Sequence, residues 1–154
     1  MQLDSFDRAI LRLIQTDNRR PNREIAGEIC LSETAVRRRL DRMRSEGVIA
    51  ADVSLLERDA AGQTLIVAVT FGDDRPEVYE RFKRRMIEDE QVSQVYSVAA
   101  PVDFIIHVHA ATLAAYEAWA QDRLLCDPDI ARFDTTVVFS TVKYSTALPV
   151  PDEN

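Results

Sequence analysis

Hydrophobic residues in the first fifty positions recur at helical spacing in three short runs. The apolar positions of these runs are, in order, Phe6, Ile10, Leu13 and Ile14, then Ile25, Ala26 and Ile29, then Val36, Leu40 and Met43. Asp4, Asn22 and Ser32 precede the runs as expected N-cap residues, and Gly47 follows the third run, where a left-handed C-terminal cap is favoured. Residues 1–50 are therefore predicted to form three helices.

The second and third of these helices are joined by a tight turn of about four residues, which is typical of a helix-turn-helix motif. In that motif the first turn of the later helix enters the major groove, so side chains there are expected to contact DNA bases: Glu33, Thr34, Arg37 and Arg38. Side chains around the motif are expected to contact phosphates: Arg20, Asn22, Arg23, Ser32 and Arg42. Arg39 is expected instead to be held in an ion pair with Glu28 or Asp41.

The pattern changes after residue 50. Weak alternation in residues 51–56 predicts a short wing or linker strand within a linker of residues 51–62, and Gly62 marks the expected domain boundary. Strands are predicted over residues 65–71, 92–99, 102–109 and 130–142, with one helix beginning at Pro76 and another capped by Thr112. The fold class is therefore α+β, a winged helix-turn-helix domain followed by a ferredoxin-like βαββαβ domain over residues 63–150 and a tail over 151–154.

The first strand of this second domain is apolar on both faces, at Leu65, Val67 and Val69 and at Ile66 and Ala68. A ferredoxin-like sheet has helices on one face only, and an apolar bare face is most readily buried against a second copy of the chain. A homodimer is therefore expected as the smallest stable unit.

The net charge of −7 is unevenly distributed along the chain. Residues 1–50 contain 10 Arg and 8 acidic residues, whereas residues 51–154 contain 9 basic and 18 acidic residues. The acidity belongs to the second domain, so it does not exclude DNA as a partner of the first. An arginine-rich helix face is more often only a solvated surface, but the three-helix pattern around it favours DNA binding.

Other candidate chemistry is sparse. His107 and His109 share one face of a predicted strand, and Asp103 is expected on the same face. Two histidines at this spacing could bind a metal ion, but no third ligand is evident, so the alternative interpretation is that they are ordinary polar positions of the sheet. Cys30 and Cys126 are isolated and are expected to be reduced packing residues. With only four glycines, no P-loop or GxGxxG motif exists, and no GxSxG or HExxH motif occurs. Neither an enzyme nor a cofactor is predicted.

No apolar run is long enough to span a bilayer, and the acidic N-terminus is unlike a secretory signal. The expected location is the cytoplasm, in association with the nucleoid.

At this level of detail the chain resembles the Lrp/AsnC, or feast/famine, family of transcriptional regulators. The matching stretches are Leu3-Asp4 with Asp7 and Ile10-Leu11, Arg20 to Ala26, Leu31-Ser32 with Val36, Arg39 and Leu40, Glu46 to Ile49, Asp103-Phe104, Tyr116, and Val142-Lys143 to Leu148-Pro149. The resemblance implies a sequence-specific DNA-binding regulator of dyad sites, built from dimers that assemble into tetramers or octamers. It also implies a small effector, usually an amino acid, bound between C-terminal domains.

The chain departs from this family at two places. Members commonly carry Gly-Asp-Tyr-Asp where this chain has Ala100, Pro101, Val102 and Asp103, so these four are the expected effector-binding positions. Ala100 replaces the glycine, and Pro101 lacks a backbone N–H that could donate to an effector. Cys30 replaces a frequent Gly in the turn of the motif, and a left-handed residue there would cost about 1 kcal/mol.

Two alternative functions remain open. The altered loop favours an effector-independent or DNA-organising regulator. The second alternative, suggested by His107 and His109, is an enzyme resembling the siroheme decarboxylases. Such an enzyme is expected to lack a DNA-binding face, so the arginine cluster of the third helix argues against it.

Overall fold

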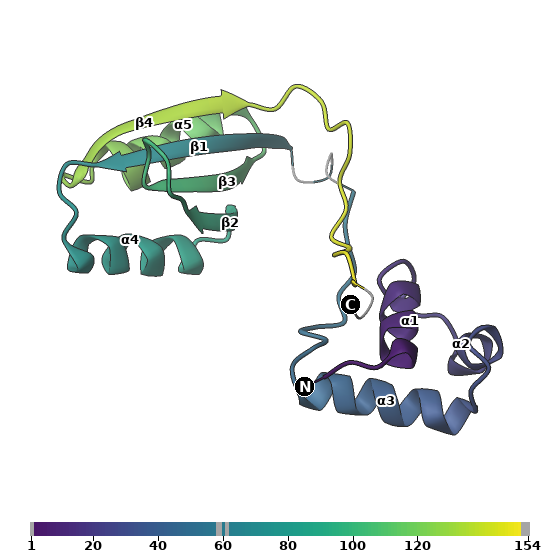
Figure 1. Cartoon of the computed structure of the whole chain (residues 1–154). Coiled ribbons are helices and arrows are strands. Elements are labelled where there is room, and N and C mark those ends of the chain that lie inside the picture. The colour runs from purple at the N-terminus through teal and green to yellow at the C-terminus, as the bar shows by residue number, and fades with distance from the viewer. Residues whose placement is uncertain (1, 58–59, 61, 152–154) are drawn as a thin grey trace. The chain divides into compact units, whose positions relative to one another are not determined.

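The structure is a computed structural model that describes residues 2–57, 60 and 62–151. The chain forms two compact units (Figure 1). One contains the residues up to Leu55 together with the segment that begins at Lys143, and the other contains Leu56–Val142. The C-terminal segment therefore packs with the helix-turn-helix unit, a contact that the sequence did not indicate.

The first unit contains three helices: α1 (Ser5–Ile14), α2 (Asn22–Glu28) and α3 (Glu33–Ser45). Its buried core consists of Ile10, Ile25, Ala26, Val36, Leu40 and Met43. All six were among the apolar positions predicted from helical spacing, which confirms the helix-turn-helix architecture, and Leu13, Ile14 and Ile29 pack against them. Phe6 was predicted to lie on the same side, but its side chain is exposed.

Most of the predicted helix ends are confirmed. The Asp4 side chain accepts a hydrogen bond from Asp7 N–H (2.8 Å), and the Asp7 side chain accepts one from Asp4 N–H (3.1 Å), forming a capping box. Ser32 Oγ accepts from Ala35 N–H (3.1 Å), and Gly47 is left-handed with φ of 71°. The prediction for Asn22 was wrong, because Pro21 occupies the N-cap position and Asn22 is the first helical residue.

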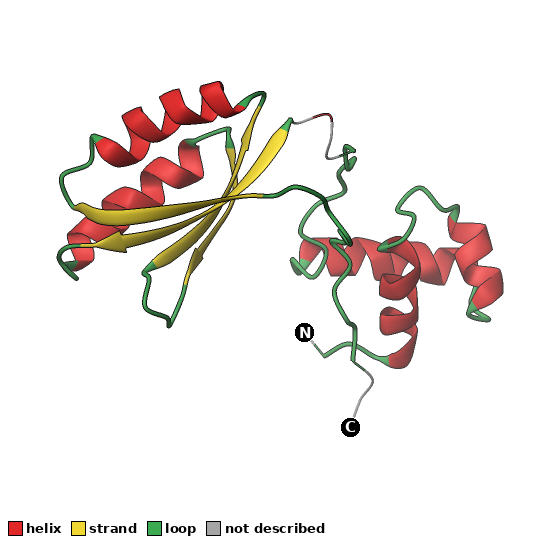
Figure 2. Ribbon diagram, turned by 90° about the horizontal axis from the view of Figure 1, so that it is seen from above, coloured by secondary structure: helices red, strands yellow, loops and turns green. Residues whose placement is uncertain are grey.

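The second unit is a four-stranded antiparallel sheet in the order β2-β3-β1-β4. Its strands are β1 (Gln63–Phe71), β2 (Val92–Ser97), β3 (Phe104–Ala110) and β4 (Ile130–Val137). Helices α4 (Pro76–Glu88) and α5 (Leu113–Ala120) lie on one side of the sheet (Figure 2), and a π-helix (Gln121–Leu125) extends α5. The predicted βαββαβ order is confirmed.

The core of this unit lies between the helices and one sheet face. Leu65, Val67 and Val69 of β1 pack there against Phe82 of α4 and the neighbouring strands. Trp119 of α5 is buried in this core, whereas Leu113, at the start of the same helix, is half exposed. Neither α4 nor α5, the α-helices described in this unit, lies over the opposite sheet face (Figure 2).

The connections between domains differ from the expectation. Residues 51–57 have no regular secondary structure, so the predicted wing or linker strand is wrong. Gly62 does precede β1, with φ of 79°, and a Cβ there would lie 2.5 Å from the carbonyl oxygen of Ala110. This close approach explains why the chain has a glycine there. No helix among the described residues is long and apolar enough to cross a membrane.

Candidate nucleic-acid interface

The first turns of α3 carry the predicted base-contacting residues on the surface. Glu33, Thr34, Arg37 and Arg38 are all exposed. Ser32 Oγ accepts a hydrogen bond from the helix, so its hydroxyl hydrogen remains available as a donor. The buried stripe of α3 faces the core of the unit, and these four side chains lie off that stripe.

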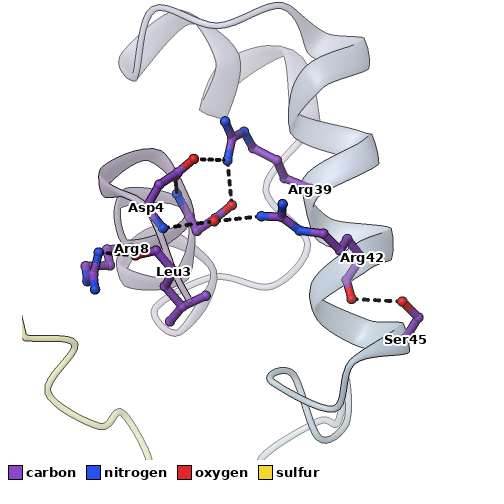
Figure 3. A network of polar contacts seen from close by, with 7 residues as sticks. Leu3, Asp4, Arg8, Arg39, Arg42 and Ser45 are labelled. Carbon is purple, nitrogen blue, oxygen red and sulfur yellow. Dashed lines mark hydrogen bonds and ion pairs between the residues drawn. The ribbon is translucent and has the colours of Figure 1, made fainter. Parts of the chain in front are cut away.

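The later arginines of α3 are held by acidic residues of α1 (Figure 3). Arg39 Nη1 donates to Asp4 Oδ2 and Asp7 Oδ1, both at 2.7 Å, and Arg42 Nη2 donates to Asp7 Oδ2 at 2.7 Å. The Asp7 side chain is only 1% exposed, so both its oxygens are used inside the protein. The expected ion pair of Arg39 exists, but its partners are Asp4 and Asp7 rather than Glu28 or Asp41.

This network shifts the pKa values of its members. Burial opposes ionisation of Asp4, but hydrogen bonds from Asp7 N–H and Arg39 outweigh it, and the pKa of Asp4 lies below its ordinary value. The hydrogen bonds to Asp7 and Asp4 raise the pKa of Arg39. Both groups therefore stay charged, and the pairing joins the start of α1 to the recognition helix.

Two further arginines of this unit are paired. Arg20, predicted to contact phosphate, is hydrogen-bonded to Glu28, and Arg44 Nε lies 3.0 Å from Asp52 Oδ2. Arg42 is the second predicted phosphate contact that is already in an ion pair. For Arg20 and Arg42, contact with DNA would need a phosphate to share or displace a carboxylate.

The remaining cations are not neutralised. Within the described ranges, no ion pair involves the side chains of Arg19, Arg23, Arg37 or Arg38, and all four are exposed. Arg20, Arg39, Arg42 and Arg44 of the same unit are paired with acids, whereas the positive charge of these four is not compensated by any described ion pair. The sequence had indicated pairing for Arg39 only, and it did not indicate that Arg20, Arg42 and Arg44 are paired as well.

The turn between α2 and α3 contains a strained residue. Cys30 has φ of 57°, the one left-handed non-glycine residue among those described, and its side chain is exposed. Cys126 is exposed too, so the expectation that both cysteines are packing residues is wrong.

We expect Cys30→Gly to raise the free energy of unfolding by about 1 kcal/mol, because glycine has no Cβ to clash in the left-handed conformation. Urea titration followed by circular dichroism measures this change. Cys30→Ala is the control, since it removes the thiol and keeps the Cβ. If alanine stabilises the protein as much as glycine, the gain does not come from the backbone conformation.

The predicted effector loop lies between β2 and β3. Asp103 Oδ2 accepts from Phe71 N–H (2.8 Å) and Oδ1 accepts from Tyr79 OH (2.6 Å). The hydrogen bond to Asp103 raises the pKa of Tyr79 to about 12. Asp103 thus connects β1 and α4, while Ala100 and Pro101 are exposed and Val102 is half-buried.

The two histidines lie on the sheet face opposite the helices. His109 is hydrogen-bonded to Ser93 Oγ (2.8 Å) and Thr64 Oγ1 (3.3 Å), and His107 packs edge-on to Tyr96. The Asp103 side chain accepts its hydrogen bonds elsewhere, from Phe71 N–H and Tyr79 OH. No cluster of three or more potential metal ligands occurs within the described residues.

An exposed recognition helix with free arginines, joined to a ferredoxin-like domain, defines a DNA-binding regulator with a separate second domain. Comparison with known proteins agrees. The chain matches the AsnC-type helix-turn-helix domain over residues 3–44 and the Lrp/AsnC ligand binding domain over residues 64–148. The chain belongs to the Lrp/AsnC family of transcriptional regulators.

Individual relatives match over nearly the whole chain. The HTH-type transcriptional regulator y4tD of Sinorhizobium fredii is 38% identical, covering 97% of this chain and 90% of the relative. The leucine-responsive regulatory protein of Escherichia coli is 29% identical, covering 96% of this chain and 92% of the relative. The structure of an AsnC family regulator from Agrobacterium tumefaciens superposes with a TM-score of 0.89 at 28% identity, covering 96% and 97% of the two chains.

Proposed function

We propose that this transcriptional regulator reads DNA sequence through side chains of α3 that contact base edges: Arg37, Arg38, Glu33 and Thr34. Contacts with DNA phosphates by Arg23, Asn22 and Ser32 would position the protein on the DNA. The observation that carries this proposal is the division of the α3 arginines. Arg39 and Arg42 are held by Asp7, whereas Arg37 and Arg38 are exposed and have no acidic partner in the described structure. An unpaired guanidinium can donate two parallel hydrogen bonds to guanine. The protein would act on the chromosome, in the cytoplasm.

We expect Arg38→Ala to weaken binding to the preferred site by about 1–3 kcal/mol and to leave binding to random DNA nearly unchanged. Arg23→Ala is the matched control, because loss of a phosphate contact weakens binding to both DNAs alike and reduces the salt dependence. Titration of labelled DNA at several salt concentrations measures both. Equal losses of Arg38→Ala on the two DNAs would refute base reading by this residue.

We also propose that the chain acts as a homodimer joined through the uncovered sheet face. The centre of this face consists of Ile66, Ala68 and Ile105 with His107, all half-buried in the single chain. Its rim is polar, with the Arg132–Asp134 ion pair on β4. An apolar centre with a polar rim is the usual composition of a protein interface. Two-fold symmetry then presents two recognition helices to a dyad site, and dimers can assemble into tetramers or octamers.

The second domain is proposed to bind an amino acid or another small effector near residues 100–103. The support is membership in the Lrp/AsnC family and the name of the leucine-responsive relative. Both Asp103 oxygens already accept a hydrogen bond within the domain, so an effector amino group bound to this carboxylate would share its oxygens with Phe71 N–H and Tyr79 OH.

A thermal-shift screen of the amino acids tests the effector. We expect one of them to raise the melting temperature, because a ligand at one hundred times its Kd adds about 2.7 kcal/mol to the native state. Absence of a shift with every amino acid would favour an effector-independent regulator instead.

A further inference from the structure

The C-terminal segment lies against α1 of the helix-turn-helix unit. Leu148 N–H donates to Gln15 Oε1 (2.7 Å), and Gln15 Nε2 donates back to the carbonyl oxygen of Leu148 (3.1 Å). One turn earlier on the same helix, Arg12 Nη2 donates to the carbonyl oxygen of Val150 (2.9 Å). Three hydrogen bonds, two donated by and one accepted by side chains of α1 and its C-cap residue, therefore bind the backbone of this segment.

The segment forms one wall of a hollow in this unit. The hollow has a volume of about 820 Å³ and is lined by the end of α1, by residues 49–55 and by residues 146–148. The Leu148 side chain is 74% exposed, so the segment is not held by burying this side chain. Binding depends instead on the backbone N–H and C=O groups of an extended chain. An amide side chain such as that of Gln15 can both accept from a backbone N–H and donate to a backbone C=O.

This contact has a topological consequence. Residues 138–145 join the segment to the end of β4, and residues 56–62 join the helix-turn-helix to the start of β1. When residues 146–150 are bound to α1, the helix-turn-helix unit is attached to the sheet unit by two stretches of chain instead of one. A doubly attached unit samples fewer orientations than a singly attached one.

We propose that the α1 surface formed by Arg12 and Gln15 is a docking site for an extended backbone. Its occupant is the chain's own residues 146–150, which act as a strap that limits the orientations of the helix-turn-helix. This role depends on the proposed dimer. In the dimer, the strap raises the affinity for a dyad site, because a second recognition helix with restricted orientation has a higher effective concentration at the second half-site. It does not alter the affinity of one helix-turn-helix for one half-site.

The test compares two substitutions at one exposed position in the full chain. Leu148→Pro removes the N–H that donates to Gln15, whereas Leu148→Ala shortens the side chain and keeps the N–H. Gln15→Ala removes the same contact from the other partner, and Gln15→Glu keeps only the acceptor. Hydrogen exchange of the Leu148 amide, and trypsin cleavage after Lys143, report docking without DNA.

We expect slow exchange at the Leu148 amide in the native chain and in Leu148→Ala, and about fivefold faster exchange in Gln15→Ala. Trypsin is expected to cut Leu148→Pro and Gln15→Ala faster than Leu148→Ala. On DNA, Leu148→Pro and Gln15→Ala should bind a dyad site about tenfold more weakly and a single half-site equally well.

Three results would overturn the proposal in distinguishable ways. If the native Leu148 amide exchanges as fast as that of Gln15→Ala, or if Leu148→Ala and Leu148→Pro are cleaved alike, the docking site is refuted. Loss of docking with no change at the dyad site refutes the tethering role. If the native chain shows docking but does not prefer dyad DNA, the proposed function fails while the docking site stands.

Discussion

Asp7→Ala is expected to lower the free energy of unfolding of the helix-turn-helix unit by about 3 kcal/mol. The substitution removes one half of the capping box of α1 and both carboxylate oxygens bound by Arg39 and Arg42. Removing one partner of a buried ion pair typically costs about 3–5 kcal/mol. The lower value applies because the Arg39 and Arg42 side chains are 19% and 43% exposed and regain water.

Two optical signals separate this effect from unfolding of the other unit. Trp119 is the only tryptophan of the chain and lies in the core of the sheet unit, so its fluorescence reports that unit alone. Urea titration should shift the transition seen by circular dichroism and leave the fluorescence transition in place. Asp41→Ala is the control, since this carboxylate is 68% exposed and lies 3.9 Å from Arg44; a change below about 0.5 kcal/mol is expected. Equal effects of the two variants would show that the Asp7 network contributes no special stability.

Ile66→Asp is expected to convert the dimer into monomers, with a dissociation constant at least about a thousandfold higher. Ile66 lies on β1 at the centre of the uncovered sheet face, opposite His107 of β3. In a two-fold dimer the substitution buries two carboxylates without partners, and each costs several kcal/mol, against roughly 4 kcal/mol for a thousandfold change. Analytical ultracentrifugation measures the dissociation constant, and binding to dyad DNA should weaken with it.

Ile87→Asp is the matched control for this experiment. Ile87 lies on α4 and its side chain is 77% exposed, so the same change of residue adds a solvated charge. It should leave the dissociation constant unchanged. A dimer that persists in Ile66→Asp, with circular dichroism confirming the fold, would place the subunit interface elsewhere on the molecule.

These predictions depend on contacts between residues far apart in the chain. Such contacts are seen only in the structure, whereas the sequence indicates features that depend on neighbouring residues. The periodicity of Ile10, Val36 and Leu40 predicted the helices and the buried side of each one, because helical spacing is local. Ser32 and Gly47 were identified as helix ends for the same reason, since capping depends on a few adjacent residues. Asn22 was assigned wrongly because Pro21 takes the N-cap position.

The order of strands and helices in the second half was also predictable, because alternation and helical spacing are local patterns. The structure of the segment after Ile49 could not be predicted in this way, because a short stretch of weak alternation forms a strand only if a neighbouring strand pairs with it. The contact of the C-terminal segment with the first unit was not predicted, because its binding partner, Gln15, lies 133 residues away.

By itself the sequence determined that this chain carries a helix-turn-helix followed by a ferredoxin-like domain, and most of the buried positions of the first three helices. The tertiary structure alone decided which charges are available to DNA. In the sequence, Arg37, Arg38, Arg39 and Arg42 are like residues of one predicted helix, and only Arg39 was expected to be paired, with other acids than the ones that hold it. Folding brings Asp7 within 2.7 Å of two of them across 32 and 35 residues, and leaves the other two exposed. Local patterns set the elements, whereas pairing of charges depends on distances that exist only after the helices have packed.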